Sequence, residues 1–200
     1  MPKKIYLVAV FALFMAPLAA QVAPAGEGSA TPISFWIGAS ISTFNPDYGC
    51  ANSSPFSCGE HQLIGVSPYL DTNYFLFDRI GAEGEARLLL WHGPATLIET
   101  SYLGGPRMRL FRTGNLNLNA KILVGSGHLD VPGHLLGAGS YFVYAPGAAI
   151  DYRIAAHLAA RVEYEYQIWP GYGCFKCSNG SGGLTPNGFS FGLAYAVHSH

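Results

Sequence analysis

The sequence predicts an all-β fold, an eight-stranded antiparallel up-and-down transmembrane β-barrel. Three observations lead to this prediction. Apolar and polar side chains alternate along many short segments, which is the period of a β-strand. Charges of both signs share one face of these segments with Gly and Ser while the other face is apolar, as in a wall between lipid and a polar interior. Short turns and long polar loops alternate between the segments, as in an up-and-down barrel.

The alternation is clearest between Arg79 and Phe111. In steps of two, the first half places only small or apolar residues on one face: Ile80, Ala82, Gly84, Ala86, Leu88 and Leu90. The opposite face carries Glu83, Glu85 and Arg87. After a break at residues 92–96 the pattern resumes, with Glu99, Arg107 and Arg109 on the polar face. The two halves therefore read as a hairpin whose charged face is turned to the barrel interior.

The other six strands show the same pattern with less regularity. They are expected at Pro32–Phe44, Leu63–Asn73, Leu116–Val131, Ser140–Arg153, Leu158–Trp169 and Asn187–Val197. A tight turn is expected at Arg112–Gly114. Pro68, Pro106 and Pro146 fall inside these strands, where each removes one ladder hydrogen bond. The glycines next to Pro106 and Pro146 favour β-bulges at both places, whereas Pro68 has no such neighbour.

Residues 1–20 have the features of a secretory signal peptide. Lys3 and Lys4 precede the apolar run Ile5–Ala16, which ends in small residues. These twelve apolar residues are too few to span a bilayer as a helix. Residues 21–31 read as a short periplasmic lead, and residues 32–197 as the barrel. An exported chain of this kind is expected in the bacterial outer membrane.

Composition agrees with a single membrane barrel. Of 200 residues, 50% are hydrophobic and 12% are charged, which is about half the charge of an average soluble domain. The net charge of −1 excludes a typical nucleic-acid partner. About 180 residues remain after removal of the signal peptide, which suits eight strands but not sixteen. We expect a monomer without a cofactor, whose partners are outer-membrane lipid and the barrel-assembly machinery.

Several segments also carry a family resemblance. They include IGAEGEARLLLWHGPA, ETSYLGGPRMRLF, YFVYAPGAAIDYRI, RVEYEYQIWP and GLTPNGFSFGLAYAV, and together they span most of residues 63–197. The chain resembles the small OmpA-like outer-membrane β-barrel proteins, a group that includes porin-family and opacity-type surface proteins. The resemblance implies an eight-stranded barrel but no particular activity, since relatives include structural and adhesive members.

Most charged residues of the mature chain fall on inward faces. We predict that they form an ion-pair network in the lumen: Glu83, Glu85, Arg87, Arg107, Arg109, Lys121, Asp151, Arg153, Arg161, Glu163 and Glu165, with Asp71 and Glu99 on the same faces. A hairpin centred near residue 95 pairs Glu83 with Arg107, and one centred near 156 pairs Asp151 with Arg161. Eight strands enclose a space that side chains fill, where unpaired charge is costly. The network is therefore interpreted as a structural plug, and a small gated pore is the alternative.

The four cysteines lie in two predicted loops. Cys50 and Cys58 are in the first loop, and Cys174 and Cys177 are in the last. In an exported chain they are expected to form disulfides, either within each loop (50–58 and 174–177) or between the two loops. A zinc site that combines the C-x-x-C pair with His61 is the alternative.

Two other functional classes need weighing. Outer-membrane lipid A deacylases carry a His and a Ser on the outer wall as H-x-S, and residues 126–128 hold the reverse order, Ser-Gly-His. No orienting carboxylate is evident on that face, and this chemistry needs one. A soluble lipocalin-like carrier requires an apolar interior, which the inward charges contradict. We therefore predict no enzymatic activity and a structural or surface-interaction role through the loops, with a lipid-modifying enzyme as the alternative.

Overall fold

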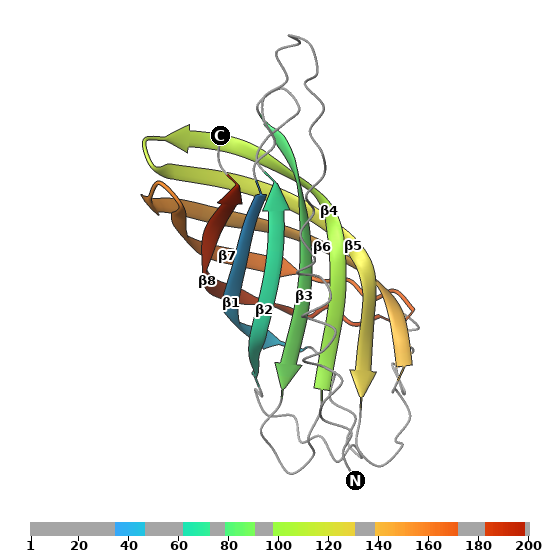
Figure 1. Cartoon of the computed structure of the whole chain (residues 1–200). Helices are drawn as coiled ribbons and strands as arrows, with labels where there is room; N and C mark the ends of the chain where they lie inside the picture. The colour runs from blue at the N-terminus through green and yellow to red at the C-terminus, as the bar shows by residue number, and fades with distance from the viewer. Residues whose placement is uncertain are drawn as a thin grey trace, which may run out of the picture. The chain divides into compact units, whose positions relative to one another are not determined.

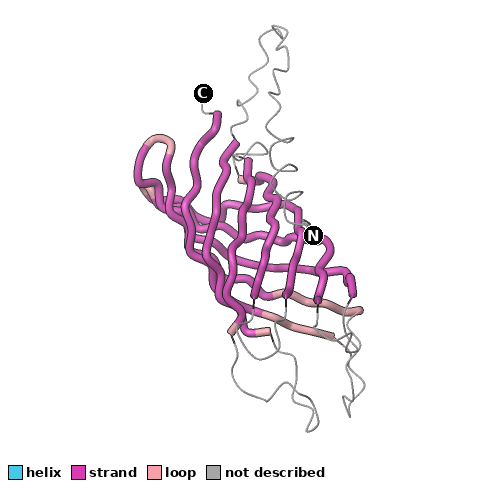
Figure 2. Tube along the Cα trace, turned by 60° about the horizontal axis from the view of Figure 1, so that its bottom comes forward, coloured by secondary structure: helices cyan, strands magenta, loops and turns pink. Residues whose placement is uncertain are grey.

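Eight antiparallel strands close into a barrel in this computed structural model, which describes residues 35–46, 62–72, 79–90, 98–130, 139–171 and 183–198. The strands are β1 (Phe35–Asn45), β2 (Leu63–Thr72), β3 (Ile80–Leu90), β4 (Ile98–Thr113), β5 (Leu116–Asp130), β6 (Gly139–Ala155), β7 (Leu158–Tyr166) and β8 (Asn187–His198). Each strand pairs with the next in sequence, and β8 closes the barrel on β1 (Figure 1). Neighbouring strands run side by side around the wall (Figure 2). The predicted eight-stranded up-and-down barrel is confirmed.

Several predicted features lie outside the described residues. They are the signal peptide, the lead at residues 21–31, the start of the first expected strand and most of the long loops, together with all four cysteines. The part of the chain that the structure describes contains no helix long and apolar enough to cross a membrane.

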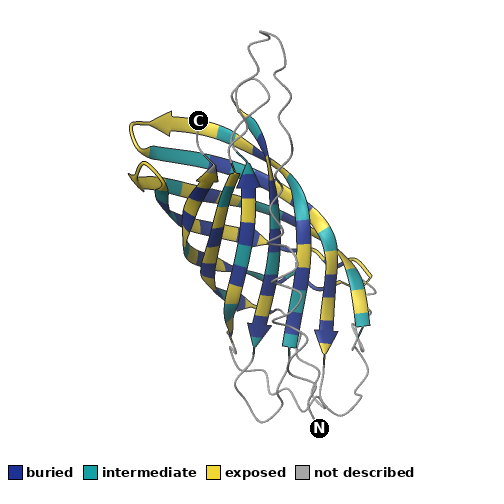
Figure 3. Cartoon of the chain, in the orientation of Figure 1, coloured by how far each residue is buried: buried dark blue, intermediate teal, exposed yellow. Residues whose placement is uncertain are grey.

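Burial alternates along the strands as the sequence pattern predicts. In β7, Val162 and Tyr164 face outward, whereas Arg161, Glu163 and Glu165 are buried. The same alternation of buried and exposed residues runs along the other strands (Figure 3). Because a residue period of two assigns one face to each medium, the barrel has an apolar outer wall and an interior that holds nearly all of its buried charged residues.

The prolines are accommodated differently from the prediction. The ladder register is the same before and after Pro68, Pro106 and Pro146, so none of them sits in a bulge. Instead, pairing lapses around each proline on one side only, toward β3, β5 and β7 respectively. On the other side each proline keeps its ladder partner. Each missing N–H therefore goes with the loss of two successive ladder pairs and no change of register.

The two tight turns that the structure describes lie at one end of the barrel, called here the turn end. Gly114 and Asn115 join β4 to β5, one residue later than predicted, and Gly114 has φ +52°. Glycine tolerates this left-handed conformation, which two-residue hairpins require. Two of the three register shifts in the described ladders lie close to these turns, between Arg109 and Phe111 and between Arg153 and Ala155, and the third lies between Phe35 and Trp36. We call the opposite end, where the long loops connect the strands, the loop end.

One of the two predicted hairpin registers is wrong. Glu83 lies opposite Gly105, and Arg107 lies opposite Gly81, which moves each partner by two positions from the prediction. A shift of two preserves the facing of every side chain, so the alternation pattern alone could not detect it. Asp151 lies opposite Arg161, as predicted.

Candidate functional site: the barrel interior

Ten charged side chains meet in the middle of the barrel. They come from β2 to β7 and are joined by ion pairs, and we call them the ionic cluster: Asp71, Glu83, Glu85, Arg87, Arg107, Lys121, Asp151, Arg161, Glu163 and Glu165. Six carboxylates face four cationic groups, which leaves a formal charge of −2 when all are ionised.

Lys121 lies at the centre of the ionic cluster. Its Nζ is 3.0 Å from a carboxylate oxygen of Glu83, 2.9 Å from one of Glu85, 2.7 Å from one of Glu163 and 3.1 Å from one of Glu165. The lysine is only 3% exposed. One ammonium group therefore holds together carboxylates from two non-adjacent strands, β3 and β7.

Arg87 continues the cluster toward the loop end. Its Nη1 donates to Glu165 at 2.7 Å, and its Nη2 donates to Glu85. Its Nε donates to the Ser67 hydroxyl at 3.1 Å, while the Phe44 ring lies 4.3 Å from the guanidinium carbon. All three guanidinium nitrogens have partners, which a buried arginine requires.

Two arginines hold the cluster on the side of the turn end. Arg161 contacts Asp71 at 2.6 Å, Glu83 at 3.1 Å and Asp151 at 2.7 Å. Arg107 contacts the same three acids, at 2.5 Å for Asp71 and for Asp151 and at 3.6 Å for Glu83. Arg107 and Glu83 are thus diagonal neighbours, although they are not directly opposite in the ladder.

Small residues on the facing wall make room for these long side chains. The inward positions of β1, β2 and β8 include Gly38, Ser42, Ser67, Ser190 and Gly192. The Ser42 hydroxyl lies 2.7 Å from that of Ser67 and 2.8 Å from that of Ser190, so it hydrogen-bonds to both. Long charged side chains from β3 to β7 can therefore extend across the lumen without collision.

Inward glycines also accommodate aromatic rings. A Cβ added to Gly38 would lie 2.1 Å from the Tyr69 ring, and one added to Gly127 would lie 2.3 Å from the Trp169 ring. Each glycine therefore provides the space into which a neighbouring ring packs, a known way of stabilising glycine in strands.

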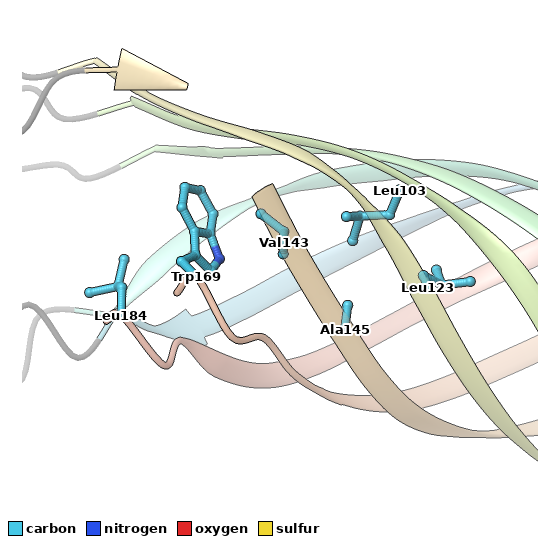
Figure 4. Close-up of a cluster of buried hydrophobic side chains, with 6 residues drawn as sticks. All are labelled: Leu103, Leu123, Val143, Ala145, Trp169 and Leu184. Atoms are coloured by element: carbon cyan, nitrogen blue, oxygen red, sulfur yellow. The ribbon is translucent and has the colours of Figure 1, made fainter. Parts of the chain in front are cut away.

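Apolar side chains fill part of the interior between the ionic cluster and the loop end. We call them the apolar cap: Leu103, Leu123, Val143, Ala145, Trp169 and Leu184 (Figure 4). Trp169 Nε1 donates to Gln167 Oε1 at 2.8 Å, and Gln167 Nε2 donates to Glu165 Oε1 at 2.9 Å. This chain of hydrogen bonds connects the cap to the ionic cluster.

Arg109 and Arg153, which the sequence assigned to the network, lie nearer to the turn end. Arg109 is half-buried on β4. Arg153 is exposed, and its guanidinium carbon lies 5.9 Å from the centre of the Trp36 ring. Asp71, which shares the inward face of β2, is a full member of the ionic cluster.

Carboxylates converge at one place where a cation could bind. Oxygen atoms of Glu83, Glu85 and Glu163 lie within 4.8 Å of one another. Lys121 Nζ is hydrogen-bonded to all three, so the chain itself supplies the cation at this place.

The outer wall carries the Ser and His that the sequence drew attention to. Ser126 and His128 both face outward, as predicted. However, His128 Nδ1 lies 3.1 Å from the hydroxyl of Ser140 on β6, its direct ladder partner. Among the hydrogen bonds of the described residues, none joins His128 to a carboxylate. His61, the histidine of the alternative zinc site, lies outside the described residues.

Three solved structures share this fold with the chain. Neisserial surface protein A matches with a TM-score of 0.58 and 12% identity, over 82% of this chain and 99% of that chain. Ail, the attachment invasion locus protein of Yersinia pestis, matches with a TM-score of 0.50 and 16% identity, over 82% and 97%. The outer membrane protein OprG from Pseudomonas aeruginosa matches with a TM-score of 0.51 and 12% identity, over 83% and 96%.

Structure comparison finds similar proteins, whereas sequence comparison finds none. No protein-family model matches the chain, and no curated protein matches it. The resemblance to small outer-membrane barrels is confirmed at the level of the fold. The closed eight-stranded barrel and its apolar outer wall are those of a membrane β-barrel, as the sequence predicts, and these neighbours share the fold.

Proposed function

We propose that this outer-membrane barrel is a non-enzymatic protein with a closed lumen, which acts in envelope stability or surface interaction through its loops. The observation that carries the closed lumen is the position of Lys121 among four carboxylates from opposite walls. An eight-stranded barrel leaves little space beyond its inward side chains. Ion conductance across a planar bilayer tests the closed lumen directly.

Two barriers in series support the plug over the alternative of a small gated pore. The ionic cluster crosses the lumen from β2 to β7, and the apolar cap lies between it and the loop end. An ion that passes the apolar cap loses hydration there without gaining a partner. A pore requires both layers to rearrange together, since hydrogen bonds through Gln167 connect them.

The proposal that the loops take part in surface interaction is supported by proteins that share this fold. Two structures with this fold belong to a surface protein of Neisseria and to the attachment invasion locus protein of Yersinia pestis. In the present chain, loop segments with two cysteines each follow β1 and β7. Disulfides within each loop would stiffen a surface for binding, because they restrict the conformations of the free chain.

We expect no hydrolytic activity on membrane lipids. A serine nucleophile needs a base and a group that orients the base, and the pair Ser140–His128 has no such third member among the described hydrogen bonds. Folded protein incubated with lipopolysaccharide or phospholipid should release no more fatty acid than heat-denatured protein does. Ser140→Ala and His128→Ala should not differ from the parent. Acyl release that Ser140→Ala abolishes, and Ser126→Ala does not, would establish the enzyme instead.

A further inference from the structure

Exposed arginines line the inner face of the barrel wall at the turn end. They are Arg79, Arg112 and Arg153, and we call them the mouth arginines. The Arg109 amide donates to the Arg79 carbonyl at 2.7 Å, and Arg112 lies opposite the inward residue Asn117. Arg153 faces inward because it lies two positions from a member of the ionic cluster on β6. The mouth arginines therefore surround the opening of the lumen, away from the apolar outer wall.

An aromatic ring lies across this opening from one of the arginines. The guanidinium carbon of Arg153 is 5.9 Å from the centre of the ring of Trp36, which belongs to the inward face of β1. Strands β1 and β6 are not neighbours in the barrel, so this contact crosses the opening. A ligand that enters here therefore meets cations on one wall and an aromatic surface on the other.

Amide side chains stand among the mouth arginines. Asn115, Asn117 and Asn119 follow one another in steps of two, from the turn into β5. Asn119 Nδ2 donates to Asp151 Oδ2 at 2.8 Å. By contrast, Asn117 Oδ1 is buried and accepts no hydrogen bond within the described part of the chain. A buried acceptor of this kind requires a donor, which a backbone amide of a bound peptide supplies.

The charge of the mouth arginines is available to a ligand. Among the ion pairs of the described residues, none includes a mouth arginine. Asp151, two positions from Arg153, is engaged by Arg107 and Arg161 of the ionic cluster. Arg109 has an interaction partner of its own and is not counted with the mouth arginines.

We propose that the opening at the turn end binds an acidic peptide from the periplasm, the compartment that the short turns face in outer-membrane barrels. The mouth arginines are spread from β3 to β6, which is about 14 Å at the usual spacing of strands. One phosphate or carboxylate group is too small to bridge this width. Carboxylates at alternate residues of an extended peptide cover about 13 Å over five residues.

The groups at the opening match this ligand in kind as well as in spacing. Guanidinium groups bind carboxylates through two parallel hydrogen bonds. Asparagine side chains both donate to and accept from peptide groups. A polyphosphate matches the charge of the mouth arginines, but it has no amide to donate to Asn117 Oδ1.

Peptide binding to the folded barrel tests this proposal. The parent is placed in phosphatidylcholine nanodiscs, which leave both ends of the barrel in water. It is titrated into rhodamine-labelled Glu-Gly-Glu-Gly-Glu with blocked ends, and binding is followed by fluorescence anisotropy. We expect saturable binding that weakens as salt is added. In Arg112→Gln/Arg153→Gln the dissociation constant should rise about two- to fivefold for each arginine removed.

Matched probes and variants separate the peptide from its charge. The peptide Gln-Gly-Gln-Gly-Gln should not bind, and Thr113→Gln, on the outer face of the same hairpin, should bind like the parent. Asn117→Ala should weaken peptide binding about two- to tenfold and leave binding of tripolyphosphate unchanged. Each variant must show the heat-modifiable gel migration of a folded barrel.

The absence of saturable binding by the parent would overturn the proposal, as would unchanged affinity in the double glutamine variant. Equal binding of the glutamine peptide would show that carboxylates are not recognised and would also overturn it. Tighter binding of tripolyphosphate than of the acidic peptide would identify a different ligand, with the same consequence. None of these results depends on whether the lumen conducts.

Discussion

Lys121→Met should lower the free energy of unfolding by about 3–5 kcal/mol, because removal of one partner from a buried ionic network leaves the others uncompensated. Four carboxylate groups lie within 3.1 Å of the lysine nitrogen, so their mutual repulsion is no longer offset. Methionine fills most of the same volume, which limits any cavity effect. Urea unfolding in lipid vesicles, followed by tryptophan fluorescence and gel migration, measures the change.

Two comparisons isolate the electrostatic origin of this effect. Arg112→Met removes an exposed cation on neighbouring β4 and should change stability by less than about 0.5 kcal/mol in zwitterionic vesicles. The second variant, Lys121→Met/Glu163→Gln, removes one of the repelling carboxylates and should recover about 0.5–3 kcal/mol relative to Lys121→Met. If Lys121→Met were as stable as the parent, water would have to solvate the cluster and the lumen could not be dry.

Val162→Arg should destabilise the barrel by about 2–4 kcal/mol, the cost of an arginine on the lipid face near the bilayer midplane. Val162 is 42% exposed on the outer wall, at the middle of β7, between the outward residues Ile150 and Phe191. The same unfolding titration measures the loss. Ile168→Arg introduces the same charge nearer to the loop end, where the expected cost is about 0–1 kcal/mol. If Val162→Arg folded as well as the parent, the outer wall would not face lipid.

Strand positions and facing were predictable because each strand separates two media. The sequence Arg161-Val162-Glu163-Tyr164-Glu165 allows only one way to place charge inside and apolar groups outside, and the structure has that arrangement. Strand ends also agree to within a few residues, since turns and loops are marked by Gly, Pro and polar residues.

Contacts across the lumen were not predictable. Register slips of two residues keep every side chain on its face, so the pattern could not choose between Gly105 and Arg107 as the partner of Glu83. The contact of Arg161 with Asp71 joins residues 90 positions apart, on strands that are not neighbours. Such contacts depend on the tilt and stagger of all eight strands, which no single strand encodes.

The apolar cap escaped prediction for a different reason. Segments such as Ile122-Leu123-Val124 are apolar on both faces, so alternation does not mark Leu123 as inward. Trp169 could have been found, because it continues the inward series Glu163, Glu165 and Gln167 in steps of two. The expectation of a uniformly polar interior concealed it.

Current through a planar bilayer tests the closed lumen most directly. Purified, refolded protein is added to a bilayer at a fixed voltage in molar potassium chloride, with heat-modifiable gel migration as proof of folding and detergent buffer as the blank. We expect the parent to give no openings above the blank, because the ionic cluster and the apolar cap leave no continuous water column. Steady, large openings from the parent would contradict the closed lumen and assign the barrel to the pores.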